Sequence, residues 1–77
     1  MVFPLFSQVQ LTQDLPQFSL KKGSIGTVVE YYPMTEGEED GYSIEGLIDQ
    51  DTVEVSESQI AIAVANTKPQ KVGSLVL

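Results

Sequence analysis

The stretch SIGTVVEYY, residues 24–32, decides the fold that the sequence predicts. Most of its residues are β-branched or aromatic, the types enriched in strands, and they do not follow the 3.6-residue period of a helix. Val28 and Val29 are adjacent, so both faces are apolar, as in a long bent strand that serves two sheets of a small barrel. Gly26 inside this strand indicates a bend, a bulge or the close approach of another backbone.

On either side of this strand, a two-residue period of apolar side chains predicts further short strands and no helix longer than one turn. The polar residues 56–59, SESQ, fit a single 3-10 turn before the last strand. The predicted fold is all-β, a five-stranded, partly open SH3-like barrel. An OB-like barrel is the alternative, but it usually needs longer strands and often a helix. The strands are expected at residues 7–12, 24–32, 41–48, 52–55 and 60–64.

Alternation within these strands assigns side chains to faces. In the strand at 41–48 one face carries Tyr42, Ile44 and Ile48, and the other carries Ser43, Glu45 and Leu47. Val53 and Val55 are expected to point inward. In the last strand the larger residues Ile60, Ile62 and Val64 alternate with alanines.

A chain of 77 residues forms one domain, which we place at residues 1–65, followed by a C-terminal tail at 66–77. A domain of this size buries only about 60% of the surface that its unfolded chain exposes, so its core is small. Residues 1–6, MVFPLF, lack the basic region of a secretory signal, and no run approaches the ~20 apolar residues of a membrane span. A soluble, cytoplasmic protein without a membrane partner is expected.

The residue types that are missing exclude several chemistries. The chain has no cysteine, histidine, tryptophan or arginine. Without thiol or imidazole, the commonest nucleophile–base pairs and transition-metal sites cannot be built, so we expect neither an enzyme nor a cofactor. The net charge is −7, and residues 1–64 carry all eleven acids but only two of the four lysines.

Residues 21–26, KKGSIG, have the outline of the KOW-like turn that some small RNA-binding barrels carry. A nucleic-acid-binding accessory protein is therefore the alternative function. The structural interpretation is that Gly23 supplies a positive φ in a turn. We favour it and expect no nucleic-acid partner, because phosphate binding needs several cations and Lys21 and Lys22 lie on a strongly acidic body.

The acidic segment EGEEDG, residues 36–41, resembles the first half of an EF-hand calcium loop. The twelfth position of such a loop requires a bidentate Glu, but here it is Leu47, and flanking helices are not predicted. We therefore interpret the segment as a solvated loop and expect no metal site.

Aromatic residues next to this loop suggest a face that binds another protein. SH3-type domains hold extended peptides on aromatic side chains between two loops, and the neighbouring acids favour a basic partner. Pairing through the open edges of the barrel offers a route to a homo-oligomer. The expected contact residues are Phe18, Tyr31, Tyr32, Glu36, Glu38, Glu39, Asp40 and Tyr42.

Several motifs resemble a bacterial domain-of-unknown-function family, number 4926. They are V-x-L-x-x-D-x-P (residues 9–16), L-x-x-G-x-x-G-T-V-V-E (20–30), the tyrosine-led strand from Tyr42 and SESQI (56–60). The resemblance covers residues 6–64 and departs where Gly46 replaces an expected aromatic. It implies a small SH3-like barrel and no assigned activity. Family members look like small proteins encoded beside toxin-like proteins, which implies an acidic partner or antidote of a basic, toxin-like protein.

Overall fold

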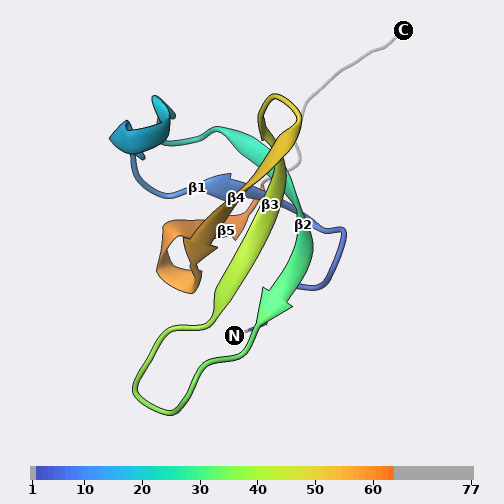
Figure 1. The fold of residues 1–77 in the computed structure, drawn as a ribbon, viewed down its shortest axis with the longest axis vertical. Coiled ribbons are helices and arrows are strands. Elements are labelled where there is room, and N and C mark those ends of the chain that lie inside the picture. Colours follow the sequence, from blue (N-terminus) through green and yellow to red (C-terminus); the bar gives the residue numbers. More distant parts are fainter. Residues whose placement is uncertain (1, 64–77) are drawn as a thin grey trace, which may run out of the picture.

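The structure, a computed structural model, describes residues 2–63 of the chain. In these residues five antiparallel strands form one sheet in the order β4-β3-β2-β1-β5 (Figure 1), and its two end strands do not pair, so the sheet is not closed. The all-β, five-stranded, open fold predicted from the sequence is confirmed. The strands are β1 (Gln8–Leu11), β2 (Ile25–Tyr32), β3 (Gly41–Ile48), β4 (Asp51–Ser56) and β5 (Ile60–Ile62).

Two 3-10 turns accompany the strands in residues 2–63, whereas the sequence predicted one. The expected turn is η2 (Glu57–Gln59), directly before β5. It begins with a capping box in which the Ser56 and Gln59 side chains each accept a backbone N–H of the other residue. The additional turn is η1 (Pro16–Phe18), in the loop between β1 and β2. Pro16 lies at its start, where the ring fixes φ and the missing N–H costs nothing.

Strand β2 bends and connects the two halves of the sheet, as predicted. Its first residues pair with β1 and residues 27–32 pair with β3. A bulge lies between Val28 and Glu30. Val28 also pairs with the N-terminal segment, because its N–H donates to the Ser7 carbonyl (3.0 Å) and its carbonyl accepts from the Phe6 N–H (2.6 Å). The extra residue of a bulge increases local twist, which lets one strand turn through the corner of the fold.

Gly26 lies at this corner because another strand approaches it closely. A Cβ at Gly26 would lie 2.5 Å from Ile44 Cγ2 and 2.8 Å from the Glu45 carbonyl oxygen. Gly46, on the facing strand, has a φ of +97° and breaks the regular pairing of β3 with β4 between Glu45 and Ile48. Both glycines are therefore required locally, one for space and the other for its backbone conformation.

The core occupies the concave side of the curled sheet. Tyr42, at its centre, is fully buried, and its ring lies 5.4 Å from Phe3 and 5.3 Å from Tyr31, measured between centroids. Both isoleucines of β5 pair with β1, but Ile60 is buried and Ile62, at the end of the strand, is 45% exposed. The buried apolar residues are Phe3, Val9, Leu11, Leu15, Val28, Tyr42, Ile44, Val53, Val55 and Ile60.

Some sequence-based boundaries lie beyond the described residues. The last strand was expected to reach residue 64, and in the described part it ends at Ile62. The proposed domain end at residue 65 and the tail at 66–77 lie outside the described residues. Within residues 2–63, no helix is long and apolar enough to cross a membrane.

Candidate partner-binding face

The convex face of β2, β3 and β4 carries the features most suited to binding a partner. Directly paired residues of neighbouring strands point to the same side of a sheet. Val53 and Val55 of β4 are buried. The residues that alternate with them, Thr52, Glu54 and Ser56, therefore face outward. The strand register then places two rows on this outer face, Tyr32–Gly41–Ser56 and Glu30–Ser43–Glu54.

A chain of hydroxyl groups fixes the outer face. The Tyr32 hydroxyl lies 2.7 Å from Ser43 Oγ, which donates to Glu54 Oε2 at 2.8 Å. Ser43 has a single hydroxyl hydrogen, so Tyr32 donates to Ser43 and Ser43 donates to the carboxylate. Thr52 Oγ1 donates to the same Glu54 oxygen at 3.2 Å. This network holds the Tyr32 ring and the Glu54 carboxylate in defined positions, which lowers the entropy cost of binding a ligand there.

A hollow of about 320 Å³ lies beside Tyr32. It forms because Gly41 has no side chain between Tyr32 and Ser56 in the same row. Tyr32 and Met34 border it and are 41% and 52% exposed, so both side chains can contact a ligand in the hollow. The other lining residues are Glu39, Gly41, Tyr42, Glu54, Val55, Ser56 and Gln59.

One wall of the hollow is the acidic loop, residues 33–40, which is fastened to the turn η2. The Glu39 carboxylate accepts the Ser58 backbone N–H at 2.9 Å and the Ser58 hydroxyl at 3.1 Å. These two donors hold the pKa of Glu39 below its ordinary value of 4.5. The ionised carboxylate thus connects the loop to the segment that precedes β5.

Asp40 fastens the other end of the same loop. Its carboxylate accepts the Met34 backbone N–H at 3.0 Å and the Tyr31 hydroxyl at 2.7 Å. The Met34 N–H first, and the Tyr31 hydroxyl second, lower the pKa of Asp40 from its ordinary value of 3.8. The same hydrogen bond to Asp40 raises the pKa of Tyr31 to about 12. Asp40 therefore positions Met34 at the rim of the hollow.

The residues predicted from the sequence are only partly brought together. Tyr32, Glu39 and Asp40 lie at the hollow or its loop, and Glu36 and Glu38 are exposed further along the loop. The ring of Tyr31 is half-buried against Tyr42.

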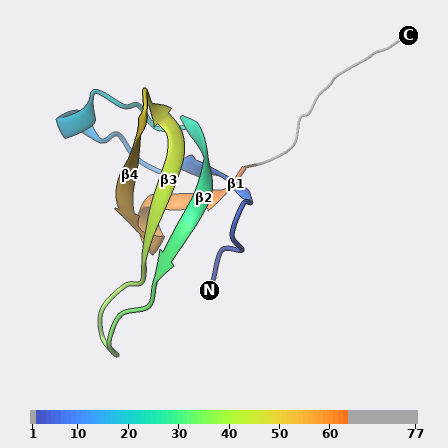
Figure 2. The ribbon, with the colours of Figure 1, turned by 45° about the vertical axis from the view of Figure 1, so that its right-hand side comes forward.

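Two predicted residues lie elsewhere. Tyr42 is fully buried and only contributes to the floor of the hollow. Phe18 lies in η1, at the opposite end of the molecule from the acidic loop (Figures 1 and 2). The structure therefore does not form a platform of Phe18 with Tyr31 and Tyr32, because the loop that carries Phe18 folds back at the other end of the sheet.

Sequence reasoning missed three residues of this face, Met34, Gly41 and Glu54. The alternation of TVEV could have placed Glu54 outward, because Val53 and Val55 face inward. No local sequence pattern predicts the strand register that places Glu54 beside Ser43 and Gly41 beside Tyr32. The hollow depends on that register.

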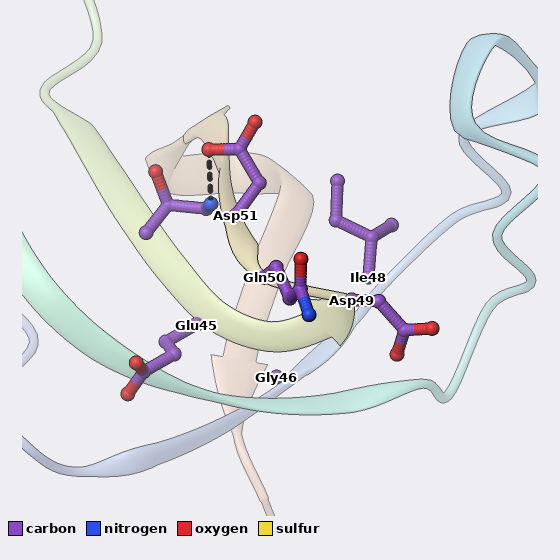
Figure 3. Close-up of a pocket in the computed structure, with 7 residues that line it drawn as sticks. Glu45, Gly46, Ile48, Asp49, Gln50 and Asp51 are labelled. Carbon is purple, nitrogen blue, oxygen red and sulfur yellow. Dashed lines mark hydrogen bonds between the residues drawn. The ribbon is translucent and has the colours of Figure 1, made fainter.

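A second hollow, of about 540 Å³, lies at the turn between β3 and β4. Figure 3 shows that the side chains of Glu45, Asp49 and Asp51 point in different directions around it. One oxygen of Asp51 accepts the Thr52 N–H at 2.8 Å. Among residues 2–63, no group of three or more histidine, cysteine or acidic side chains is arranged to hold a metal ion. In the acidic loop, the carboxylates of Glu38, Glu39 and Asp40 likewise accept hydrogen bonds from different partners.

The lysine pair of the KOW-like turn lines neither hollow. Lys21 and Lys22 are exposed in the loop that follows η1, and the Lys22 N–H donates to Asp14 Oδ1 at 2.8 Å. Gly23 has a φ of +92°, with nothing within 4 Å of a built Cβ. Its role in the turn is thus conformational, as the structural interpretation predicted.

We expect acid to detach the acidic loop from η2. A carboxyl group whose pKa is lowered by folding stabilises the fold above its ordinary pKa, and the contribution is lost as the pH falls through the lowered value. For Glu39 the loss therefore begins below about pH 4.5. The amide resonance of Ser58, followed by NMR between pH 7 and 2, should shift in this range. Glu39→Gln should abolish that transition. The pH-dependent shift of the Met34 amide, which reports the protonation of Asp40, should remain. A Ser58 amide that responds equally in both proteins would contradict the assignment.

Comparison with known proteins finds one family. A family model described as a domain of unknown function (DUF4926) matches residues 5–51. The matched segment includes β1, β2 and β3 and ends at the first residue of β4, so it contains Tyr32 and the acidic loop but not η2 or β5. No curated protein and no solved structure matches the chain.

Proposed function

The chain belongs to the family described as domain of unknown function DUF4926, a name that assigns no activity, and we propose from its geometry that it is a non-catalytic module that binds another protein. The bound element is an extended, basic segment of that partner. Its side chains contact the outer face of β2–β4, and one of them lies in the hollow beside Tyr32 and Met34. The proposed contact residues are Tyr32, Met34, Glu39, Gly41 and Glu54.

The observation that carries this proposal is the combination of the hollow with the charge around it. Among residues 2–63, the charged side chains on the outer face of β2–β4 are all carboxylates, those of Glu30, Glu45 and Glu54. A Lys or Arg side chain packs its aliphatic stem on an aromatic ring while its charged end stays near a carboxylate. Tyr32 and Glu54, joined through Ser43, supply both contacts at one place.

The charge also bears on the class of partner. An acidic surface repels nucleic acid at long range and speeds association with basic proteins. The two lysines within residues 2–63 lie at the other end from the hollow, in the loop after η1. We propose that the encounter takes place in the cytoplasm, where a cysteine-free chain loses no disulfide to the reducing conditions.

The partner can be sought with the full chain as bait in a lysate of its native host. We expect one dominant basic protein, retained at 50 mM salt and released as the salt is raised several-fold, because exposed ion pairs are screened. Tyr32→Ala should reduce retention about tenfold or more, the effect of removing an aromatic anchor at the centre of an interface. Phe18→Ala is the matched control, since it removes an exposed ring at the opposite end.

Retention that is unchanged by Tyr32→Ala, or equally reduced by Phe18→Ala, would contradict the proposed face. An electrophoretic shift with single- or double-stranded RNA at micromolar protein would instead favour the KOW-like alternative. The family resemblance adds a specific candidate, a basic toxin-like protein encoded by a neighbouring gene. Co-expression with that neighbour shows whether the two products purify together.

A further inference from the structure

Strand β4 is the free edge of the sheet on the side of the proposed face. It is the last strand in the order, so no described strand pairs with its outer edge. In an antiparallel pair, hydrogen-bonded and non-hydrogen-bonded residue pairs alternate. The Glu57 N–H donates to the Asp40 carbonyl, and Asp40 stands opposite Glu57 in this register. Counting along the strand, Val55 and Val53 therefore bond to β3, and the N–H and C=O of Ser56, Glu54 and Thr52 point to the free edge.

Side chains already occupy part of this edge. The Ser56 N–H donates to Gln59 Oε1 and the Thr52 N–H donates to Asp51 Oδ1, both at 2.8 Å. These two bonds agree with the outward direction of both N–H groups. Between them lies Glu54, whose N–H and C=O face the same edge. Proteins commonly protect edges with charged or capping side chains, and here the protection is concentrated on either side of Glu54.

We propose that the partner segment binds as an additional strand on β4, antiparallel and centred on Glu54. This inference rests on the proposed function and specifies how the same face is used. The residue opposite Glu54 exchanges two backbone hydrogen bonds with it, and its side chain lies on the outer face beside the Glu54 carboxylate. The strand extends toward Ser56, where the next outward side chain reaches the hollow bordered by Tyr32.

The position of the added strand dictates its sequence pattern. Side chains next to Glu54 lie on an acidic face and are Lys or Arg. The alternate side chains turn toward the core side, next to the buried Val53 and Val55, and are apolar. The partner segment therefore alternates basic and apolar residues, which distinguishes it from the proline-rich ligands of polyproline recognition.

Charge also argues against a second copy of this chain as the occupant. Two β4 strands paired about a two-fold axis at Glu54 would set the two Glu54 side chains directly opposite each other. Like charges in directly opposed positions destabilise a strand pair. Each copy would also bring a net charge of −7. A basic strand from a different protein avoids both the repulsion between opposed Glu54 side chains and the repulsion between two acidic chains.

The test uses the full chain and the peptide Ac-VKVKVKV-NH₂ in NMR titration at low salt. We expect binding, with chemical-shift changes that centre on Glu54 and an exchange rate of the Glu54 amide that falls about tenfold or more. Two peptides of equal charge decide the mode. N-methylation of the lysine amides removes the hydrogen bonds to β4, whereas N-methylation of the valine amides blocks only the far edge. The first should weaken binding about tenfold or more, and the second should leave it unchanged.

Substitutions at Glu54 test the same backbone hydrogen bonds by changing the protein instead of the peptide. Glu54→Pro removes the outward N–H without breaking a bond to β3, a place where an edge strand tolerates proline. Glu54→Gln removes the charge and keeps the N–H. We expect Glu54→Pro to abolish binding of the unmodified peptide and Glu54→Gln to retain part of it. If Glu54→Pro does not fold, the pair of methylated peptides decides alone.

The outcomes separate this inference from the proposed function. Equal binding of both methylated peptides, full binding by Glu54→Pro, or no binding of the alternating peptide at millimolar concentration overturns strand addition. If the partner is nevertheless retained from the lysate in a manner that depends on Tyr32 and salt, the proposed function stands. Concentration-dependent changes at Glu54 in the absence of peptide would assign the edge to self-association instead and overturn the inference.

Discussion

Tyr42→Ala is expected to lower the free energy of unfolding by about 3–5 kcal/mol, the cost of removing a large aromatic side chain from a core. Tyr42 is fully buried and its ring packs against two others, those of Phe3 and Tyr31. The cavity left behind would lie in the single hydrophobic core that residues 2–63 form. For domains of 60–100 residues each kcal/mol lowers the melting temperature by about 4–8 °C. The melting temperature should therefore fall by more than about 10 °C.

Thermal and urea unfolding followed by circular dichroism measure this loss. Tyr42→Phe is the matched control, because it retains the ring and removes the hydroxyl that accepts the Phe3 N–H at 3.2 Å. It should cost about 1–3 kcal/mol, the effect of leaving a buried donor without its acceptor. A Tyr42→Ala protein that melts within a few degrees of the wild type would show that the ring does not support the fold.

This tyrosine illustrates what the sequence could and could not predict. From its position at the start of an alternating strand, Tyr42 could be interpreted either as a core residue or as a contact residue. The face assignment was correct for Tyr42 and Ile44, which are both buried in the core. It was wrong for Leu47, which packs against the core because the strand register shifts between Glu45 and Ile48. Which face is the core depends on how the sheet curls, and the curl arises from a bulge at Val28 and close packing at Gly26. Those are tertiary features, and no single strand encodes them.

Phe18 shows the same limit in a loop. The residues between β1 and β2 have no period, so no pattern predicts the direction of this segment. In the structure Leu15 is buried and pairs with Leu20, which folds the loop back and carries Phe18 away from the tyrosines. Pro16 at the first position of η1 was a usable signal for a turn, but not for the side of the molecule on which the turn would lie.

The candidate site was predictable in its charge and not in its shape. The eleven acids and the tyrosines beside the loop are plain in the sequence, and they suggested a basic partner. The hollow depends on the absence of a side chain at Gly41, between Tyr32 and Ser56. A glycine at the end of an acidic loop is more commonly interpreted as part of the turn. Only the cross-strand register shows that Gly41 shapes a surface.

Gly26→Ala is expected to destabilise the protein by about 1–3 kcal/mol or more, the usual cost of overpacking, although alanine is better than glycine in an ordinary strand. The new Cβ would lie 2.5 Å from Ile44 Cγ2 and 2.8 Å from the Glu45 carbonyl oxygen. The side chain of Ile44 is fully buried and has little room to move, and the carbonyl belongs to the backbone of β3. Relief therefore requires β2 and β3 to separate at the corner where the sheet curls.

Gly41→Ala is the matched substitution, because the same methyl group is added to a glycine of the same sheet. There the nearest atoms to a built Cβ lie 3.7 Å away, an ordinary contact distance. Its free energy of unfolding should change by no more than about 1 kcal/mol, with a gain expected because alanine restricts the unfolded chain. Urea unfolding of the two variants measures the difference. Equal stabilities would mean that β2 and β3 are not in close contact at Gly26. The methyl group of Gly41→Ala also begins to fill the hollow beside Tyr32. If this variant folds normally but retains less of the partner, Gly41 is needed for binding and not for stability.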